Sequence, residues 1–370
     1  MNLSKPKTPR RLRLSLGAWR CLAKHIDGKQ PHLDWPTRTA YWLTGAGNSV
    51  LARIQHASHA DEIKTAEPAP PLFLLGFWRS GTTFLHELFC CDTRFGFAST
   101  YACMSPSHFL LTEKWMRLRS PQKTRRPMDS MQYSWTSPQE DEFALLALGA
   151  PSAYEALLVP SLMRDASWLL DVRQRPLDEL NRWAEGIQYF LRLLTVQQGK
   201  AIVLKSPPHG FRLPLLPALF PLARYVVLER NPYEVFASNM TLWRTLLDLY
   251  SLEASSTDEI EEFILAAYVL HEESIDEGLR KIDPGLVARV RYEHLISDPV
   301  VCMARLYKEL RLDDFEAARP QLERHLASVA NHARNRLRLS PAQKERIDRL
   351  WGKFIREKAY EWPDDHLTLE

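Results

Sequence analysis

Short, mostly apolar runs alternate along this chain with longer stretches in which apolar residues recur every three or four positions. The short runs cover residues 72–75, 201–204, 225–229 and 287–291. Such continuous runs are typical of strands buried on both faces of a parallel sheet. The longer stretches predict helices at residues 82–91, 177–198, 232–247, 259–282, 300–310 and 341–358. Strands joined by helical crossovers indicate an α/β fold, with a central, mostly parallel sheet and helices on both faces.

The pattern changes at residues 58–71 (SHADEIKTAEPAPP), which are small, polar and rich in proline. Such composition predicts a linker. Apolar and aromatic residues upstream of it indicate short helices. We therefore divide the chain into a basic, helical N-terminal extension at residues 1–67 and a main α/β domain at residues 68–370.

Charge excludes some partners. The 370 residues carry a net charge of only +3, so the chain is not a polycation built for nucleic acid. No acidic residue precedes Asp27, however, and the first 24 residues are strongly basic. This leader is either a solvated tail or a contact with an anionic membrane surface, and the first interpretation is favoured.

The cysteines and the hydropathy indicate the compartment. The five cysteines are an odd number and show no CxxC spacing, which predicts reduced thiols. No uninterrupted apolar run is long enough to cross a bilayer or to form a secretory signal. We expect a cytoplasmic protein that is at most peripheral at a membrane surface.

The first predicted strand leads directly into GFWRSGTT at residues 76–83, and an apolar helix follows. A strand, a glycine-bearing turn and a helix N-terminus together point backbone N–H groups at a phosphate. In the pattern GxxxxGK[ST], Thr82 stands where nucleotide triphosphatases have lysine, which argues against ATP or GTP chemistry. Arg79 supplies a cation elsewhere in the loop. The predicted phosphate ligands are Arg79, Ser80, Gly81, Thr82 and Thr83.

A second anion site is predicted after the third strand, where the sequence reads RNPYEVFAS at residues 230–238. Asn231 is a good N-cap and Pro232 a good first helical residue. Helical spacing brings Ser238 to the face of the cap, near Arg230. On its own this is an ordinary cap with an arginine, but together with the first loop it indicates a ligand with two phosphates.

The ends of the two internal strands separate the candidate enzyme classes. A magnesium-dependent phosphotransferase places an aspartate at such a position to hold the metal. Here the strands end in Lys205 and Arg230, which would repel a metal and attract a multiply anionic ligand. We expect no metal. The alternatives that stay open are a P-loop kinase-like, nucleotide-dependent transferase and a non-catalytic, basic surface-binding protein.

From about residue 71 to the C-terminus these motifs resemble the sulfotransferase superfamily, in particular its bacterial-type, tyrosylprotein-sulfotransferase-like branch. The resemblance implies a P-loop-containing, nucleotide-binding fold and a transferase that carries out sulfation. The co-substrate would be 3′-phosphoadenosine 5′-phosphosulfate (PAPS), with in-line transfer to an acceptor hydroxyl on a glycan, a lipid or a phenol, and without metal.

The resemblance also implies roles for individual residues. The RSGTT loop matches the family's 5′-phosphosulfate loop, and Arg230 with Ser238 matches its 3′-phosphate motif. Tyr292, in RYEHL followed by DP, would approach the adenine end of the donor, on which Phe84 would stack. Lys205 would stabilise charge on the transferring group. The basic stretch at residues 331–336 matches a donor-covering loop only loosely, and a solvated loop is the favoured interpretation.

The general base that accepts the acceptor's proton is not implied by the resemblance, because residues 95–104 contain no acid or histidine. Glu140 belongs to an acidic cluster that also suits a helix N-terminus. His209 lies four residues beyond Lys205. His86, on the helix after the loop, is more typical of a packed histidine. We favour Glu140 as the base, with His209 second.

Overall fold

The computed structural model describes residues 2–3, 12–26, 35–119, 124–125, 132–312, 314–329, 337–363 and 367–370. The chain forms two compact units, each assembled from several segments. The first unit comprises Met1–Ala69, Phe97–Ile202 and Trp243–Ile260, and the second comprises Pro70–Gly96, Val203–Leu242 and Glu261–Glu370. The division into an extension at residues 1–67 and a domain at residues 68–370 differs from these two units. It stays a prediction.

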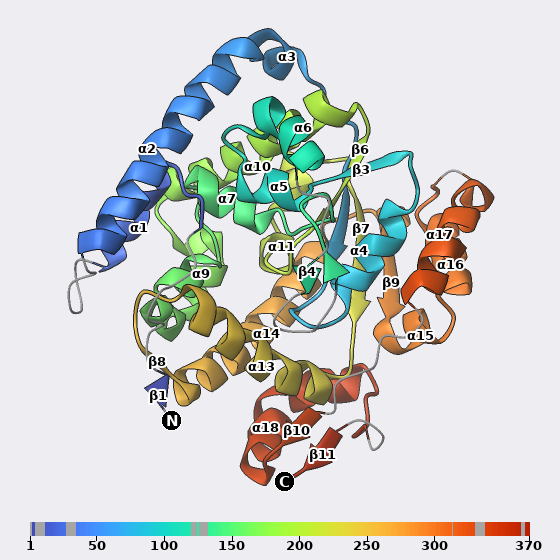
Figure 1. The fold of residues 1–370 in the computed structure, drawn as a ribbon. Coiled ribbons are helices and arrows are strands. Elements are labelled where there is room, and N and C mark those ends of the chain that lie inside the picture. The colour runs from blue at the N-terminus through green and yellow to red at the C-terminus, as the bar shows by residue number, and fades with distance from the viewer. Residues whose placement is uncertain are drawn as a thin grey trace. The chain divides into compact units, whose positions relative to one another are not determined.

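The central sheet has five strands in the order β3-β6-β2-β7-β9 (Figure 1). Their bounds are β2 Leu72–Leu75, β3 Phe95–Phe97, β6 Ala201–Lys205, β7 Arg224–Glu229 and β9 Val287–Arg291. Strand β2 pairs in parallel with both β6 and β7, and β7 pairs in parallel with β9. The four predicted strands and their parallel arrangement are confirmed. The edge strand β3 was not predicted, because its three residues carry no extended apolar run.

Successive side chains of a strand point to opposite faces of the sheet. Because β2 is buried at every residue, both of its faces are covered by helices. Leu72 and Leu74 belong to a core that also contains residues of α4 (Thr82–Cys90) and α16 (Pro299–Glu309). Phe73 points the other way and meets the ring of His209 in α11 (His209–Arg212), with 5.1 Å between centroids. The predicted α/β class is confirmed.

The predicted helices are present, with ends that shift by a few residues at most. The others beside or beyond the sheet strands are α12 Leu216–Leu219, α13 Pro232–Tyr250, α14 Thr257–Leu279, α15 Tyr292–Ser297, α17 Phe315–Val329 and α18 Pro341–Glu357. Helix α18 begins at a capping box, in which Ser340 and Gln343 each satisfy a backbone N–H of the other. The strands β10 (Leu337–Leu339) and β11 (Leu367–Leu369) form a separate parallel pair.

The first unit is mainly helical. Its helices are α1 Leu16–Ile26, α2 Trp35–Ser58, α3 Ala60–Thr65, α5 Thr100–Met104, α6 Phe109–Arg119, α7 Glu142–Leu148, α8 Glu155–Leu158, α9 Ala166–Leu170 and α10 Leu177–Gln198. Two antiparallel pairs complete it, β1 (Asn2–Leu3) with β8 (Ser255–Ser256) and β4 (Thr124–Arg125) with β5 (Gln132–Tyr133). Short 3₁₀ turns lie at Pro160–Arg164, Val172–Gln174 and, in the second unit, Pro284–Leu286.

Two expectations about the N-terminal part were wrong. The segment upstream of the linker contains one helix of 24 residues, α2, in addition to α1. The predicted linker itself contains α3, so its irregular part is only residues 66–71. Asp61 and Glu62 in the first turn of α3 and Lys64 in its last turn complement the helix dipole, which favours helix in spite of the small residues nearby.

Candidate active site

The loop between β2 and α4 has an unusual backbone. Arg79 has a φ of 67° and Gly81 a φ of 101°, so both are left-handed. A residue other than glycine is strained there by about 1–3 kcal/mol, and such residues cluster at functional sites. A Cβ on Gly76 would lie 2.6 Å from Ser80 Oγ and 2.8 Å from the Leu228 carbonyl oxygen. Glycine at both ends therefore allows the tight turn of this loop.

Residues that were predicted in two different anion sites form one network in the second unit. Arg79 Nε donates a hydrogen bond of 2.8 Å to Ser238 Oγ. Arg230 Nη1 donates to the Arg79 carbonyl oxygen at 3.0 Å. The Arg230 guanidinium carbon also lies 4.4 Å from the centroid of the Tyr292 ring. The loop after β2 is thus tied to the ends of β7 and β9.

Two carboxylates that sequence reasoning missed hold this network in place. Glu234 accepts from Arg230 Nε at 2.9 Å, and Glu293 accepts from the backbone N–H of Asn231 at 3.0 Å. Glu234 has the appearance of an ordinary first-turn acid in the sequence. Glu293 lies within the RYEHL motif, where only the tyrosine was given a role. Both acids fix the orientation of Arg230 and of the turn that follows it.

Tyr292 also packs directly against the loop. A Cβ on Gly81 would lie 2.3 Å from an edge atom of the Tyr292 ring, so only glycine fits at this position. The ring therefore fills the space between Gly81 on one side and the Arg230 guanidinium on the other. A side chain at Gly81 would have to displace both.

Gly81→Ala is accordingly expected to weaken binding of 3′,5′-adenosine bisphosphate by tenfold or more, as well as to lower the free energy of unfolding by about 1–3 kcal/mol. Calorimetry and thermal unfolding measure the two effects. Gly199→Ala is the matched control, because Gly199 also has a positive φ, 61°, but open space around it. It should lower stability and leave ligand affinity unchanged. Equal affinity for both variants would contradict the role of the Gly81–Tyr292 contact.

Lys205 ends β6 beside the loop. Its side chain is almost fully buried, and Nζ lies 3.4 Å from Thr83 Oγ1 in the first turn of α4. Ser80 is buried as well, and its Oγ finds no hydrogen-bond partner in the part of the chain that the structure describes. Since a buried hydroxyl without a partner is costly, the loop fits an anionic ligand that accepts from it.

A buried charge cluster anchors the C-terminal segment beside Arg230. Lys358 pairs with Glu229, at 3.2 Å, and with Glu272. Burial alone would raise the pKa of Glu272, but the hydrogen bond from His271 and the charge of Lys358 lower it to about 2. Asn231 Nδ2 donates to the Glu361 carbonyl oxygen at 2.7 Å. These contacts fix the turn after β7 from its outer side.

The remaining donor candidates differ in their surroundings. Thr82 is buried in the first turn of α4. Phe84 is half-buried and packs partly against the core beneath the sheet. Residues 331–336 lie outside the described part of the chain. A role for Phe84 in stacking on adenine stays a prediction.

The candidate bases occupy different surroundings too. Glu140 lies in the first unit, is half-buried and accepts a hydrogen bond from the Tyr154 hydroxyl. His209 lies in the second unit with no exposed surface, edge-on to Phe73. His86 is also buried. Burial therefore favours Glu140 over either histidine as a group that an acceptor can reach.

A model of the sulfotransferase family matches residues 70–317, which include the loop, Lys205, Arg230 and Tyr292. The chain belongs to the sulfotransferase family. It is a PAPS-dependent sulfotransferase, which moves a sulfuryl group to an acceptor hydroxyl, and the kinase alternative is set aside. Within the described ranges, His, Cys, Asp and Glu side chains nowhere gather in threes or more as a metal site.

Curated relatives and solved structures agree with this family. The omega-hydroxy-beta-dihydromenaquinone-9 sulfotransferase Stf3 of Mycobacterium bovis and of Mycobacterium tuberculosis is 33% identical over 333 residues, which cover 89% of this chain and 86% of the relative. Sulfotransferase STF1 of Mycobacterium tuberculosis H37Rv has a TM-score of 0.64 at 22% identity, with coverage of 91% and 93%. STF9 of Mycobacterium avium has a TM-score of 0.67 at 18% identity, with coverage of 96% and 99%. The two structures show that the fold is shared.

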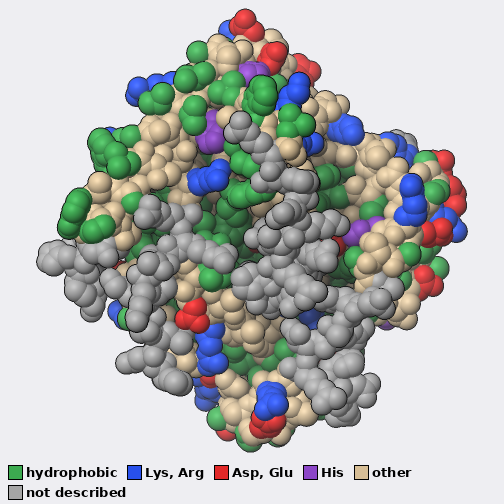
Figure 2. Space-filling view, in the orientation of Figure 1, with side chains coloured by type: hydrophobic (Ala, Val, Ile, Leu, Met, Phe, Trp, Pro, Cys, Tyr) green, Lys and Arg blue, Asp and Glu red, His purple; other side chains and the backbone are tan. Residues whose placement is uncertain are grey.

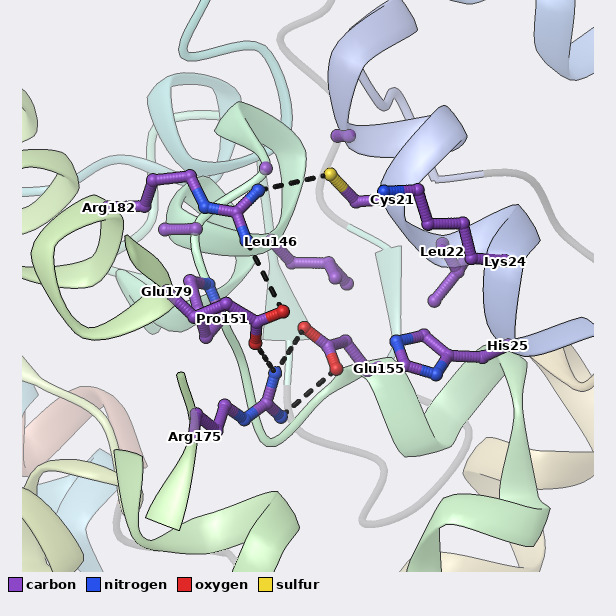
Figure 3. A pocket seen from close by; sticks show the side chains of 13 residues that line it. Cys21, Leu22, Lys24, His25, Leu146, Pro151, Glu155, Arg175, Glu179 and Arg182 are labelled. Atoms are coloured by element: carbon purple, nitrogen blue, oxygen red, sulfur yellow. Dashed lines mark hydrogen bonds and ion pairs between the residues drawn. The ribbon is translucent and has the colours of Figure 1, made fainter. Parts of the chain in front are cut away.

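The first unit of this sulfotransferase contains a pocket of about 100 Å³ that none of the predicted site residues lines (Figure 3). Its two arginines are paired with acids. Arg175 is buried and contacts Glu155 at 3.0 Å and Glu179 at 3.3 Å. Arg182 contacts Glu179 at 3.3 Å and the Cys21 thiol at 3.3 Å.

Arg175→Leu is expected to lower the free energy of unfolding by about 3–5 kcal/mol, because it leaves the Glu155 carboxylate buried without its partner. Denaturant unfolding measures the change. Arg182→Leu, in the same pocket but with a more exposed ion pair, should cost about 1 kcal/mol or less. Similar losses for both variants would show that burial of the pair does not decide its contribution.

Proposed function

We propose that this sulfotransferase holds PAPS across the carboxyl ends of β6, β2, β7 and β9. The residues proposed for the 5′-phosphosulfate are Arg79, Ser80, Gly81, Thr82 and Thr83; those for the 3′-phosphate are Arg230 and Ser238; those for adenine are Tyr292 and Phe84. The observation that carries the proposal is the network in which Arg79 reaches Ser238 and Arg230 reaches the Arg79 carbonyl. Two arginines joined in this way suit one ligand with two phosphate groups.

Lys205 and Arg79 are proposed to stabilise the charge that develops during transfer. The acceptor oxygen forms a bond to sulfur as the bond from sulfur to the 5′-phosphate oxygen breaks, which leaves 3′,5′-adenosine bisphosphate. Negative charge grows on the leaving oxygen, and preorganised cations there lower the barrier. Alignment of the acceptor oxygen and the leaving oxygen across sulfur supplies most of the remaining lowering of the barrier. The buried position of Lys205 supports this role, because low dielectric strengthens its interaction with the phosphosulfate.

Glu140 is proposed as the group that accepts the proton of the acceptor hydroxyl. Its carboxylate is half-buried, and the Tyr154 hydroxyl donates to Oε2, which fixes the orientation of the side chain. His209 is the second candidate, which its complete burial makes weaker.

Glu140→Gln is expected to lower kcat by about 100-fold or more with little change in affinity for 3′,5′-adenosine bisphosphate. Single-turnover assays with labelled PAPS and calorimetry separate the two quantities. The companion variant is His209→Asn. It should lower the free energy of unfolding and leave the proton-transfer step intact. Near-normal turnover of the Glu140 variant, together with an inactive but folded His209 variant, would assign the base to His209.

The acceptor is proposed to be a lipid hydroxyl. The support comes from Stf3, which is named for an omega-hydroxylated dihydromenaquinone acceptor and with which this chain shares 33% identity over most of its length. Incubation with labelled PAPS and separated lipid, glycan and phenol fractions of a bacterial extract tests this. Label in the lipid fraction is expected, and label only in glycans or phenols would contradict it. We also propose a cytoplasmic location and, for residues 1–24, a solvated tail in preference to a membrane contact.

A further inference from the structure

The long helix α2 of the first unit buries two polar side chains, those of Asn48 and Gln55. The residues of α2 that are buried are Tyr41, Gly45, Asn48 and Gln55. Asn48 Nδ2 donates to the Leu14 carbonyl oxygen at 3.0 Å. Gln55 donates to the Pro106 carbonyl oxygen at 3.2 Å and accepts from the Leu110 N–H at 2.9 Å. The inner face of α2 is thus held by hydrogen bonds, in contrast to the usual apolar inner face of a surface helix.

The outer face of α2 is apolar. Its exposed large hydrophobic residues, with their exposed fractions, are Trp35 75%, Trp42 51%, Leu43 59%, Val50 53% and Ile54 50%. Their spacing along the helix places them on one side, opposite the buried residues. Figure 2 shows hydrophobic side chains standing out along the flank where α2 runs in Figure 1. Contiguous exposed apolar surface of this kind marks a binding surface.

The charged residues of α2 itself and of α1 beside it have one sign. The sequence of α2 from Trp35 to Ser58 contains no Asp or Glu, and Arg38 and Arg53 are exposed on it. Helix α1 likewise contains no acid and exposes Arg20 and Lys24. An apolar face with tryptophan, on a helix whose own charged residues are all cationic, matches the boundary between headgroups and acyl chains of an anionic bilayer. Within the described helices, no segment is both long and apolar enough to cross the bilayer, which leaves surface binding.

We propose that α2 lies flat on an anionic membrane surface, with Trp35, Trp42, Leu43, Val50 and Ile54 inserted at the headgroup level and the arginines against lipid phosphates. This contact involves neither the donor network nor the proposed base. It is therefore independent of the acceptor.

Sedimentation with vesicles tests the proposal with the full chain. Wild-type protein is expected to bind vesicles of phosphatidylcholine with phosphatidylglycerol, and to bind them more weakly at high salt. The variant with Trp42→Glu and Val50→Glu should bind about 100-fold more weakly, because each apolar side chain buried in a bilayer contributes tenfold or more. The matched control carries Leu177→Glu and Leu222→Glu, at hydrophobic residues that are 70% and 67% exposed elsewhere, and should bind as wild type does.

Two further measurements decide the outcome. Calorimetry with 3′,5′-adenosine bisphosphate should give the same affinity for all three proteins, which shows that the folds are intact. Wild-type protein that does not bind the anionic vesicles, or a Trp42/Val50 variant that binds them as wild type does, would overturn the proposal. A wild-type dimer that the same variant dissociates, without vesicle binding, would instead assign the face to a second copy of the chain and also overturn it.

Discussion

Lys205→Met is expected to lower kcat by about 100-fold to 1,000-fold, with a change in affinity for 3′,5′-adenosine bisphosphate of less than about tenfold. The ammonium group is placed to meet charge that grows only as the bond to sulfur breaks, so its loss affects the transition state more than the ground state. Methionine keeps the length of the buried side chain and removes the charge. Single-turnover kinetics with labelled PAPS measure the effect.

The control for this prediction is Lys200→Met. Lys200 is an exposed lysine just before β6, at the opposite end of the same strand, and its variant should turn over normally. Thermal unfolding of both variants shows whether the fold is retained. If the Lys205 variant folds and its kcat falls less than fivefold, or if affinity falls as much as kcat, Lys205 is not the group that stabilises the transferring charge.

Arg79→Gln and Arg230→Gln are each expected to weaken binding of 3′,5′-adenosine bisphosphate by about 10-fold to 100-fold, the usual effect of losing a charge-assisted hydrogen bond. Because Arg230 donates to the carbonyl oxygen of Arg79, the two effects should not be independent. The double variant should lose less affinity than the product of the two single losses.

Arg289→Gln serves as the control for both arginines. Arg289 lies on β9 and pairs with Glu229 at 3.1 Å, with about half of its side chain exposed. Its variant should keep the affinity of wild type. Unchanged affinity after either Arg79→Gln or Arg230→Gln would show that the arginine network does not hold the donor. Equal losses of affinity in all three variants would show that only the net charge of the protein matters.

Most of the sheet was predictable because buried parallel strands are nearly continuous apolar runs. Strand β2 is buried at all four residues, and β7 at its four central ones, so these runs have few alternatives. Strand β3 lies at the edge with three residues and gives no such pattern. Helix α2 was underestimated for a physical reason as well. Its inner face includes Asn48 and Gln55 while several large apolar residues are exposed, so the usual assignment of faces fails there.

The candidate site was predictable in its membership but not in its connections. Strand β6 ends at Lys205, and other strands lead directly into the loop residues, Arg230 and Tyr292. Parallel strands bring their carboxyl ends to one edge of the sheet. Sequence position does not reveal that Arg79 adopts a left-handed backbone and donates to Ser238, since both depend on how the loop folds back. The same holds for Glu293, whose hydrogen bond to Asn231 joins residues far apart in the chain. The sequence also does not reveal that His209, the second candidate base, is buried against Phe73.

We propose that Arg79 and Arg230, at the edge of the sheet, bind the two phosphate groups of one adenosine bisphosphate. Calorimetry without magnesium is the most direct test of this binding mode. The protein is titrated separately with 3′,5′-adenosine bisphosphate and with 5′-adenosine monophosphate. We predict that the bisphosphate binds about 100-fold more tightly, because only it engages Arg230 and Ser238 as well as the loop. Equal affinities for the two nucleotides, or no binding of the bisphosphate, would contradict the account.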